Sequence, residues 1–128
     1  MNIIKFRGKC NNKWVYGYPY KEDELWMIQE YKENREFRYH IDNPDTIGQF
    51  SGLCDVNRKE IYEGDIVKVT IIDGWGNDVE LKGEVAFREG IFIIVFDRQC
   101  SPNVYSNITL YGAWGVYEDM EIVGNVYN

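Results

Sequence analysis

The sequence predicts a mainly β protein, built as a small, partly open barrel or a strongly bent antiparallel sheet with an N-terminal β subregion. Short runs rich in β-branched and aromatic residues recur along the chain, separated by glycine, asparagine and aspartate. No segment longer than two turns has a helical period of apolar residues. A chain of 128 residues with 45% hydrophobic residues can also form a packed core.

The N-terminal part is expected to contain two pairs of strands. The expected strands are residues 3–7, 13–18, 25–28 and 36–41. The polar pair Asn11-Asn12 separates the first two and is typical of a hairpin turn. In the fourth, Phe37, Tyr39 and Ile41 alternate with polar residues, which is the pattern of a half-buried strand.

The C-terminal part is expected to contain a further series of strands. They are expected at residues 66–72, 79–87, 91–97, 104–110 and 121–127. Gly90 provides the turn of the clearest hairpin, and Gly124 is expected to mark a bulge in the last strand. Residues 47–53 are too rich in glycine for an assignment, and residues 111–119 fit no period.

The chain is expected to form one domain over residues 1–128, with a soft boundary near Pro44. It separates an N-terminal β subregion, residues 1–44, from a barrel-like part, residues 45–128. Because the first part is too short to form a stable core alone, the two are expected to share one.

Charge and cysteine content exclude several classes of protein. The formal net charge is −7, which argues against binding duplex nucleic acid through phosphate neutralisation and suits a basic partner. Three widely spaced cysteines, Cys10, Cys54 and Cys100, indicate reduced thiols and a cytoplasmic protein. There is no signal-peptide core, and the longest apolar run, residues 91–96, is too short to span a membrane.

Residues 45–67, which we call the signature segment, combine several glycines with the start of a strand. Gly64 and Asp65 precede a β-branched pair, an arrangement with which SH3-like barrels often begin a strand. We expect the Asp65 carboxylate to accept backbone N–H bonds and fix this turn. The residues expected to be structural are Gly48, Gly52, Gly64, Asp65 and Gly124.

Four blocks of the chain, in order, resemble the YopX family of phage and prophage proteins. They are residues 4–8 (IKFRG), 46–53 (TIGQFSGL), 55–67 (DVNRKEIYEGDIV) and 121–127 (EIVGNVY). Arg58 departs from the usual glycine, and Cys54 from the usual lysine, while residues 74–82 and 99–115 contribute nothing to the resemblance. The resemblance implies a mainly β, barrel-like fold and a phage or prophage origin, and it supplies no catalytic residue.

No catalytic constellation, cofactor motif or metal-binding pattern is visible in the sequence. His40 is the only histidine and lies on the polar side of an alternating strand, where a solvated side chain is expected. The cysteines are expected to be buried rather than nucleophilic, although Cys100 lies in an irregular segment. The many carboxylates are expected to be solvated, and the glycine pairs lack a phosphate-binding context.

Aromatic residues are the remaining candidates for a binding surface. Trp14, Tyr16, Tyr18 and Tyr20 occupy every second position and therefore share one face of an extended segment. Trp75 and Trp114 lie beside glycines and are expected near the surface. The residues of the expected binding surface are Trp14, Tyr16, Tyr18, Trp75 and Trp114. These aromatics suit a core or a protein interface better than base stacking, because no basic groove accompanies them.

The sequence thus favours a non-enzymatic accessory protein that binds another protein and self-associates. The alternative is a module that associates with single-stranded nucleic acid during phage replication or its regulation. Exposed aromatics beside Lys or Arg would favour the second function.

Overall fold

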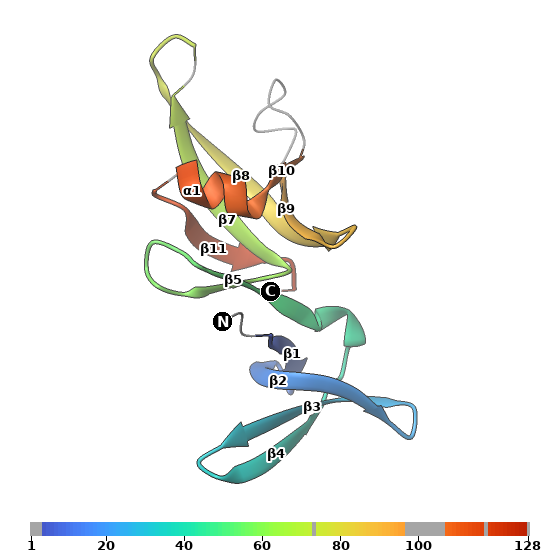
Figure 1. The fold of residues 1–128 in the computed structure, drawn as a ribbon. Helices are drawn as coiled ribbons and strands as arrows, with labels where there is room; N and C mark the ends of the chain where they lie inside the picture. Colours follow the sequence, from blue (N-terminus) through green and yellow to red (C-terminus); the bar gives the residue numbers. More distant parts are fainter. Residues whose placement is uncertain (1–3, 73, 97–106, 117, 128) are drawn as a thin grey trace. The chain divides into compact units, whose positions relative to one another are not determined.

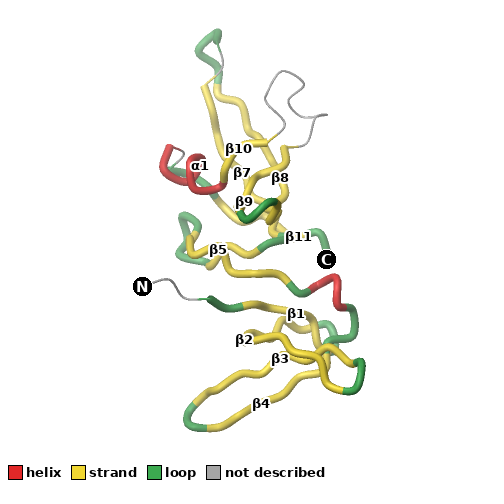
Figure 2. The backbone as a smooth tube through the Cα atoms, turned by 45° about the vertical axis from the view of Figure 1, so that its right-hand side comes forward, coloured by secondary structure: helices red, strands yellow, loops and turns green. Residues whose placement is uncertain are grey.

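The computed structural model describes residues 4–72, 74–96, 107–116 and 118–127. The chain divides into two compact units, Met1–Phe50 and Ser51–Asn128, and each is described here by itself. Strands dominate the described residues (Figures 1 and 2), so the mainly β prediction is confirmed. The described strands form antiparallel sheets, and none of these sheets closes into a barrel.

The N-terminal unit is an antiparallel meander that leads into a further strand. Its elements are β1 (Phe6–Cys10), β2 (Lys13–Glu22), β3 (Leu25–Lys32), β4 (Arg35–His40), the 3-10 helix η1 (Pro44–Thr46) and the beginning of β5 (Gly48–Cys54). The strand order is β4-β3-β2-β1-β5, with β4 outermost beside β3 (Figure 1). The two pairs of strands predicted from the sequence are therefore consecutive parts of one sheet.

The meander is joined by two-residue turns in which both residues have positive φ. Their φ values are 52° and 65° at Asn11-Asn12, 51° and 67° at Asp23-Glu24, and 54° and 61° at Glu33-Asn34. Positive φ at both positions is the geometry of the turn that matches the twist of paired strands. Asparagine and aspartate tolerate this conformation better than most residues, which explains the polar segments between the strands.

The core of the N-terminal unit lies on one side of the meander. Ile28 and Ile41 are fully buried there, and their Cδ1 atoms lie against the backbone of Gly8. Thr46 connects η1 to β1, because its hydroxyl accepts the Lys9 N–H at 3.0 Å and donates to the Asn43 carbonyl at 2.7 Å. This unit is thus held by a small apolar centre and a local hydrogen-bond network.

The C-terminal unit contains a five-stranded antiparallel sheet and a short helix. Its elements after β5 are β6 (Glu60–Tyr62), β7 (Asp65–Ile72), β8 (Asp78–Arg88), β9 (Ile91–Phe96), β10 (Asn107–Thr109), α1 (Leu110–Val116) and β11 (Glu121–Asn125). The order in the sheet is β10-β9-β8-β7-β11. The predicted bulge is present, since the register of β11 against β7 shifts between Ile122 and Gly124.

Buried side chains from most of these elements form one apolar cluster. It consists of Ile61, Val67, Val69, Leu81, Val85, Ile94, Phe96, Leu110, Ala113 and Met120. Along β7 and β8 buried residues alternate with more exposed ones, as expected for a sheet covered on one face. This cluster lies within the C-terminal unit, and the shared core predicted from the sequence stays a prediction.

Two elements were not assigned from the sequence. The glycine-rich segment forms the strand β5, and the division into two compact units falls within it, after Phe50. Residues 110–116 form the helix α1, which the sequence does not indicate because its glycines lower the helix propensity. Leu110 and Ala113 face the core. The Thr109 hydroxyl accepts the Gly112 N–H at 3.2 Å. Within the described residues, no helix is both long and apolar enough to cross a bilayer.

Candidate functional site

The N-terminal unit exposes a row of tyrosines on one face of its sheet. Trp14, Tyr16 and Tyr18 alternate along β2, and Tyr18 lies opposite Gln29 on β3. Tyr31, two residues after Gln29, therefore belongs to the same face. Trp14 is half-buried, whereas Tyr16 is exposed and Tyr18 and Tyr31 are 57% and 70% exposed. We call Tyr16, Tyr18 and Tyr31 the tyrosine face.

Basic side chains lie beside these aromatics. Lys9 is opposite Trp14, and Arg7 is opposite Tyr16, in the pairing of β1 with β2. The guanidinium carbon of Arg7 lies 4.0 Å from the centre of the Trp14 ring, and Lys9 Nζ lies 5.1 Å from it. Both distances are within the range of a cation–π interaction. The tyrosine face therefore borders on positive charge, although Arg7 itself is only 6% exposed.

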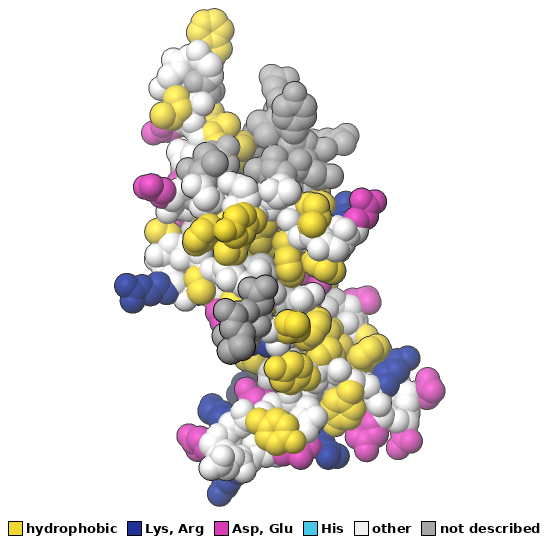
Figure 3. All heavy atoms as spheres, viewed as in Figure 1, with side chains coloured by type: hydrophobic (Ala, Val, Ile, Leu, Met, Phe, Trp, Pro, Cys, Tyr) yellow, Lys and Arg dark blue, Asp and Glu magenta, His cyan; other side chains and the backbone are white. Residues whose placement is uncertain are grey.

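The excess of negative over positive charge arises from the residues of the C-terminal unit. Residues 1–50 contain eight Lys and Arg and eight Asp and Glu, whereas residues 51–128 contain six and thirteen. Within residues 1–21 there are five Lys and Arg and no acidic residue. Figure 3 shows Lys, Arg, Asp and Glu side chains beside hydrophobic ones on the part of the surface formed by β1–β4. The net charge of the whole chain thus does not describe the tyrosine face.

Trp75 and Trp114, the other two candidates for the binding surface, lie on separate elements of the C-terminal unit. Trp75 is 90% exposed in the connection between β7 and β8. Trp114 belongs to α1, is partly exposed, and donates from Nε1 to the Cys54 carbonyl at 2.9 Å. It lines a depression of about 470 Å³ that also includes Asp55, Glu118 and Met120. Trp114 therefore has a structural contact as well as an exposed surface.

A second depression in the C-terminal unit is mainly apolar. It has a volume of about 350 Å³ and lies between α1 and β9. Phe92, Leu110 and Tyr111 form much of its wall. Ile91 and Tyr111 at its edge are exposed large hydrophobic residues, so this unit too offers an apolar surface.

In the signature segment, glycine conformation and a buried carboxylate shape the turn into β7. Gly64 has φ of +94°, which favours glycine, and its N–H donates to the Val85 carbonyl at 2.8 Å. Asp65 is 2% exposed, and its Oδ2 accepts the Tyr62 N–H at 2.8 Å. Gly52 also has a positive φ, and Gly48 lies opposite Arg7 where β5 pairs with β1. These residues position strands, and Asp65 makes a backbone contact of the kind expected for it.

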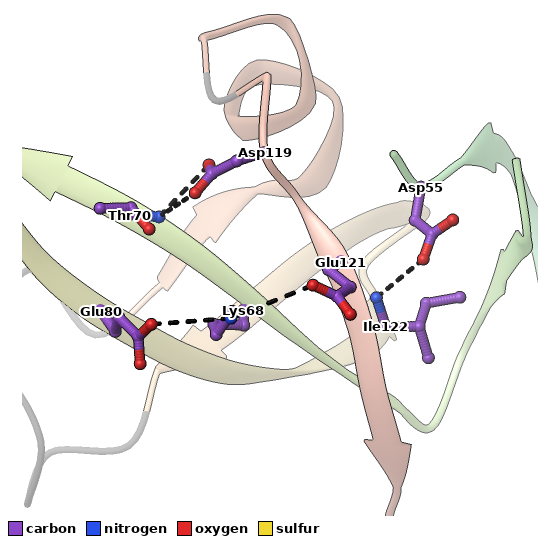
Figure 4. A network of polar contacts seen from close by, with 7 residues as sticks. All are labelled: Asp55, Lys68, Thr70, Glu80, Asp119, Glu121 and Ile122. Atoms are coloured by element: carbon purple, nitrogen blue, oxygen red, sulfur yellow. Dashed lines mark hydrogen bonds and ion pairs between the residues drawn. The ribbon is translucent and has the colours of Figure 1, made fainter. Parts of the chain in front are cut away.

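Asp55 is a second buried carboxylate in the segment, and sequence reasoning overlooked it. Its Oδ1 accepts the N–H groups of Asn57 and Lys59, each at 2.9 Å. Its Oδ2 accepts the Ile122 N–H at 2.9 Å, which connects the turn to β11 (Figure 4). An aspartate that begins a turn and is followed by Asn57 was the available signal. The long-range bond to β11 had no local sequence signal.

Arg58 occupies a backbone conformation that favours glycine. Its φ is +64°, within the turn that Asp55 holds together. Glycine, the usual residue of the YopX-like pattern at this position, would adopt this φ without strain. The turn conformation therefore does not explain why arginine is present. We expect Arg58→Gly to raise the free energy of unfolding by about 0.5–1 kcal/mol. Glycine removes the strain of the left-handed conformation from the folded state, and its greater chain entropy in the unfolded state offsets part of this gain. Urea denaturation measures this change. Lys59→Gly serves as the control and should lower stability, and a loss for both variants would contradict the prediction.

A polar network connects β7 to its neighbours in the C-terminal unit (Figure 4). Lys68 Nζ lies 3.6 Å from Glu80 Oε1 and 4.0 Å from Glu121 Oε2. The Asp119 carboxylate accepts the Thr70 N–H at 3.1 Å and 3.3 Å. A side-chain hydrogen bond with Thr70 lowers the pKa of Asp119 below its ordinary value; burial opposes this, and the backbone hydrogen bond from Thr70 lowers the pKa further.

Because the folded-state pKa of Asp119 is lowered, its contribution to stability is present above the ordinary pKa of about 3.9. It is lost as the pH falls through the folded-state value. We expect Asp119→Asn to lower stability by about 0.5 kcal/mol at neutral pH, a small effect because the group is exposed. Melting temperatures between neutral pH and pH about 2 test this, and the two curves should converge under acid conditions. Parallel curves would contradict it, and Asp78→Asn is the control.

The remaining titratable candidates do not form a reaction centre among the described residues. His40 is exposed, with Nδ1 3.7 Å from Asp42 Oδ1. The expected burial of the cysteines is wrong for Cys54, which is exposed at the end of β5; Cys10 is half-buried. Cys100 lies outside the described residues. No group of three or more His, Cys, Asp or Glu within the described ranges is placed to hold a metal ion.

Comparison with known proteins places these observations in a family. No curated protein matches the chain. The sequence profile of the family described as YopX protein matches residues 5–128, from β1 through the signature segment to the C-terminus. The match covers almost the whole chain, and the chain therefore belongs to the YopX protein family.

Proposed function

We propose that this YopX family member is a non-enzymatic phage accessory protein that acts in the host cytoplasm by binding protein, as a homo-oligomer. The observation that carries the proposal is the tyrosine face, where Tyr18 and Tyr31 are 57% and 70% exposed on one side of a sheet. Tyrosine is enriched at protein interfaces because it offers a large, rigid contact area and a polar hydroxyl.

The geometry of the two buried carboxylates of the signature segment supports binding over catalysis. Asp55 and Asp65 are 6% and 2% exposed and accept backbone N–H groups in turns. A general acid or base must reach a substrate proton, whereas these oxygens point into the chain. The described surface also exposes large aromatic and apolar side chains, which are the groups that a protein interface uses.

The test is affinity capture from infected or induced cells with matched variants. The native protein and Tyr111→Ala, a control with an exposed aromatic in the C-terminal unit, should retain the same partner. Tyr18→Ala/Tyr31→Ala should retain at least about tenfold less of it, because central aromatics carry most interface energy. Equal retention by both variants would contradict a role for the tyrosine face, and catalytic turnover by the purified protein would contradict the non-enzymatic assignment.

A second candidate function is binding of single-stranded nucleic acid by the β1–β2 hairpin. The observation that favours it is the position of Arg7 and Lys9 over Trp14, beside the exposed Tyr16 and Tyr18. Single-strand binding proteins combine aromatic side chains that stack on bases with positive charge along the backbone. Positions 1–21 contain no acidic residue, so this segment has a net positive charge that suits contact with phosphates.

Fluorescence anisotropy with a labelled single-stranded oligonucleotide tests this second function. Binding at low salt should weaken steeply as salt rises, and Lys9→Glu should weaken it further, because phosphate contacts release counterions. Lys82→Glu, an exposed lysine in the C-terminal unit, is the control and should bind as the native protein does. Absence of binding at low salt, or binding that is indifferent to Lys9→Glu, would reject this function.

A further inference from the structure

The outer strand of the N-terminal sheet, β4, has an edge that no described strand covers (Figure 1). The Ile41 N–H, just after β4, donates to the Trp26 carbonyl at 2.9 Å and so points toward β3. Because the direction alternates along an antiparallel strand, the backbone groups of Glu36, Arg38 and His40 point outward. An edge of this kind pairs readily with another strand.

β4 carries charged side chains, which usually discourage pairing at an edge, but the neighbouring outward positions Glu36 and Arg38 have opposite signs. It contains no proline, lysine or glycine, and all its side chains except Tyr39 are exposed. Glu36 and Arg38 lie on one face, and Phe37 and Tyr39 lie on the other with their rings stacked at 6.4 Å. The Arg38 Nε donates to Glu36 Oε1 at 2.7 Å within the chain. The strand thus presents alternating charge and aromatic side chains to an incoming partner.

We propose that two copies of this chain pair through β4, antiparallel, with the two-fold axis at Phe37. The proposal rests on the self-association proposed above and assigns it to one surface. The register of the pairing fixes the position of the axis, because a two-fold axis through a sheet places residues of the same face opposite each other.

An axis at Phe37 places Glu36 of each copy opposite Arg38 of the other, which forms two cross-strand ion pairs. Their outward backbone groups also form the hydrogen-bonded pairs of the ladder. The two Phe37 rings then occupy a non-hydrogen-bonded pair, in which side chains approach most closely.

The other registers are less favourable. An axis at Glu36 or Arg38 places two like charges directly opposite each other, which destabilises a strand pair. An axis at Tyr39 places Arg38 opposite His40 and leaves Glu36 without a partner strand residue in β4. Charge complementarity therefore selects the axis at Phe37.

Light scattering after size-exclusion chromatography tests the pairing with Glu36→Arg and Arg38→Glu. Each variant places like charges opposite each other twice, so each should dissociate into single chains at a concentration where the native protein is paired, with Kd raised at least about tenfold. An equimolar mixture of the two should recover the paired mass. In the mixed pair, the introduced arginine lies opposite the introduced glutamate, and the native Arg38 lies opposite the native Glu36.

Lys13→Glu, an exposed charge reversal on β2, is the control and should leave the native mass unchanged. Hydrogen exchange is the second measurement and needs no variant. The amides of Glu36 and Arg38 should exchange more slowly as protein concentration rises, because the pairing hydrogen-bonds them.

The outcomes separate the two proposals. A native protein that remains a single chain at every concentration overturns the proposed self-association and this inference with it. A native oligomer whose single variants keep their mass, or whose Glu36 and Arg38 amides exchange freely, overturns the β4 pairing alone. Monomeric variants that do not recover on mixing overturn the register.

Discussion

Replacing Gly17 with alanine is expected to lower the free energy of unfolding by about 3 kcal/mol or more, because the added Cβ atom would conflict with backbone atoms. Gly17 has φ of +152°, and a Cβ atom there would lie 2.0 Å from the Gln29 carbonyl oxygen and 2.8 Å from its carbon. The conflict is with backbone in the adjacent strand and not with a flexible side chain, so it cannot be relieved by a rotamer change.

The position of Gly17 in the sheet explains why the cost is large. β2 pairs with β1 up to Gly17 and with β3 from Tyr18 onward. Movement of the backbone at this point would therefore disturb both pairings. Urea denaturation followed by tryptophan fluorescence measures the loss. Gly74→Ala, where the added Cβ meets nothing within 4 Å, is the control, and equal stability of the two variants would contradict the account.

Asp55→Ala is expected to cost about 3 kcal/mol, because it removes the acceptor for three backbone N–H groups at a site shielded from water. The donors are Asn57, Lys59 and Ile122, and the aspartate is 6% exposed. The loss of the Ile122 bond also separates the turn from β11. The expected cost therefore exceeds that of removing a surface carboxylate.

Asp55→Asn distinguishes the hydrogen bonds from simple packing. Asparagine keeps one side-chain oxygen in a similar position. The stability of Asp55→Asn should therefore lie between that of the native protein and that of Asp55→Ala. Asp78→Ala, an exposed aspartate at the start of β8, should change stability by less than about 0.5 kcal/mol. If chemical denaturation gave Asp55→Ala the same stability as that control, the structural role assigned to Asp55 would be wrong.

Local pattern predicted most strands, because strand periodicity and turn chemistry are written in neighbouring residues. The alternation around Phe37 and Tyr39 becomes β4, and Gly90 forms the hairpin between β8 and β9. The bulge at Gly124 was also predicted correctly. β5 was missed because its glycines are poor strand formers in isolation, and pairing with β1 overrides that preference.

The helix α1 was missed for a related reason. Gly112 and Gly115 lower its intrinsic propensity, and packing of Leu110 and Ala113 against the core compensates for this. The predicted strand at residues 104–110 is β10 at residues 107–109, and residues 104–106 lie outside the described part of the chain.

The candidate surface was predicted in part. Alternation along β2 correctly placed Trp14, Tyr16 and Tyr18 on one face. Tyr31 was missed because its place beside them depends on the register of β3, which the sequence does not specify. The distribution of charge between the units could have been counted from the sequence, but only once the division after Phe50 was known.

Sedimentation equilibrium of the native protein over a wide range of concentration measures the proposed self-association, because the mass of a self-associating protein must change by mass action. We expect a mass that rises from that of one chain to at least that of two as concentration increases. A mass that stays at one chain throughout would contradict it.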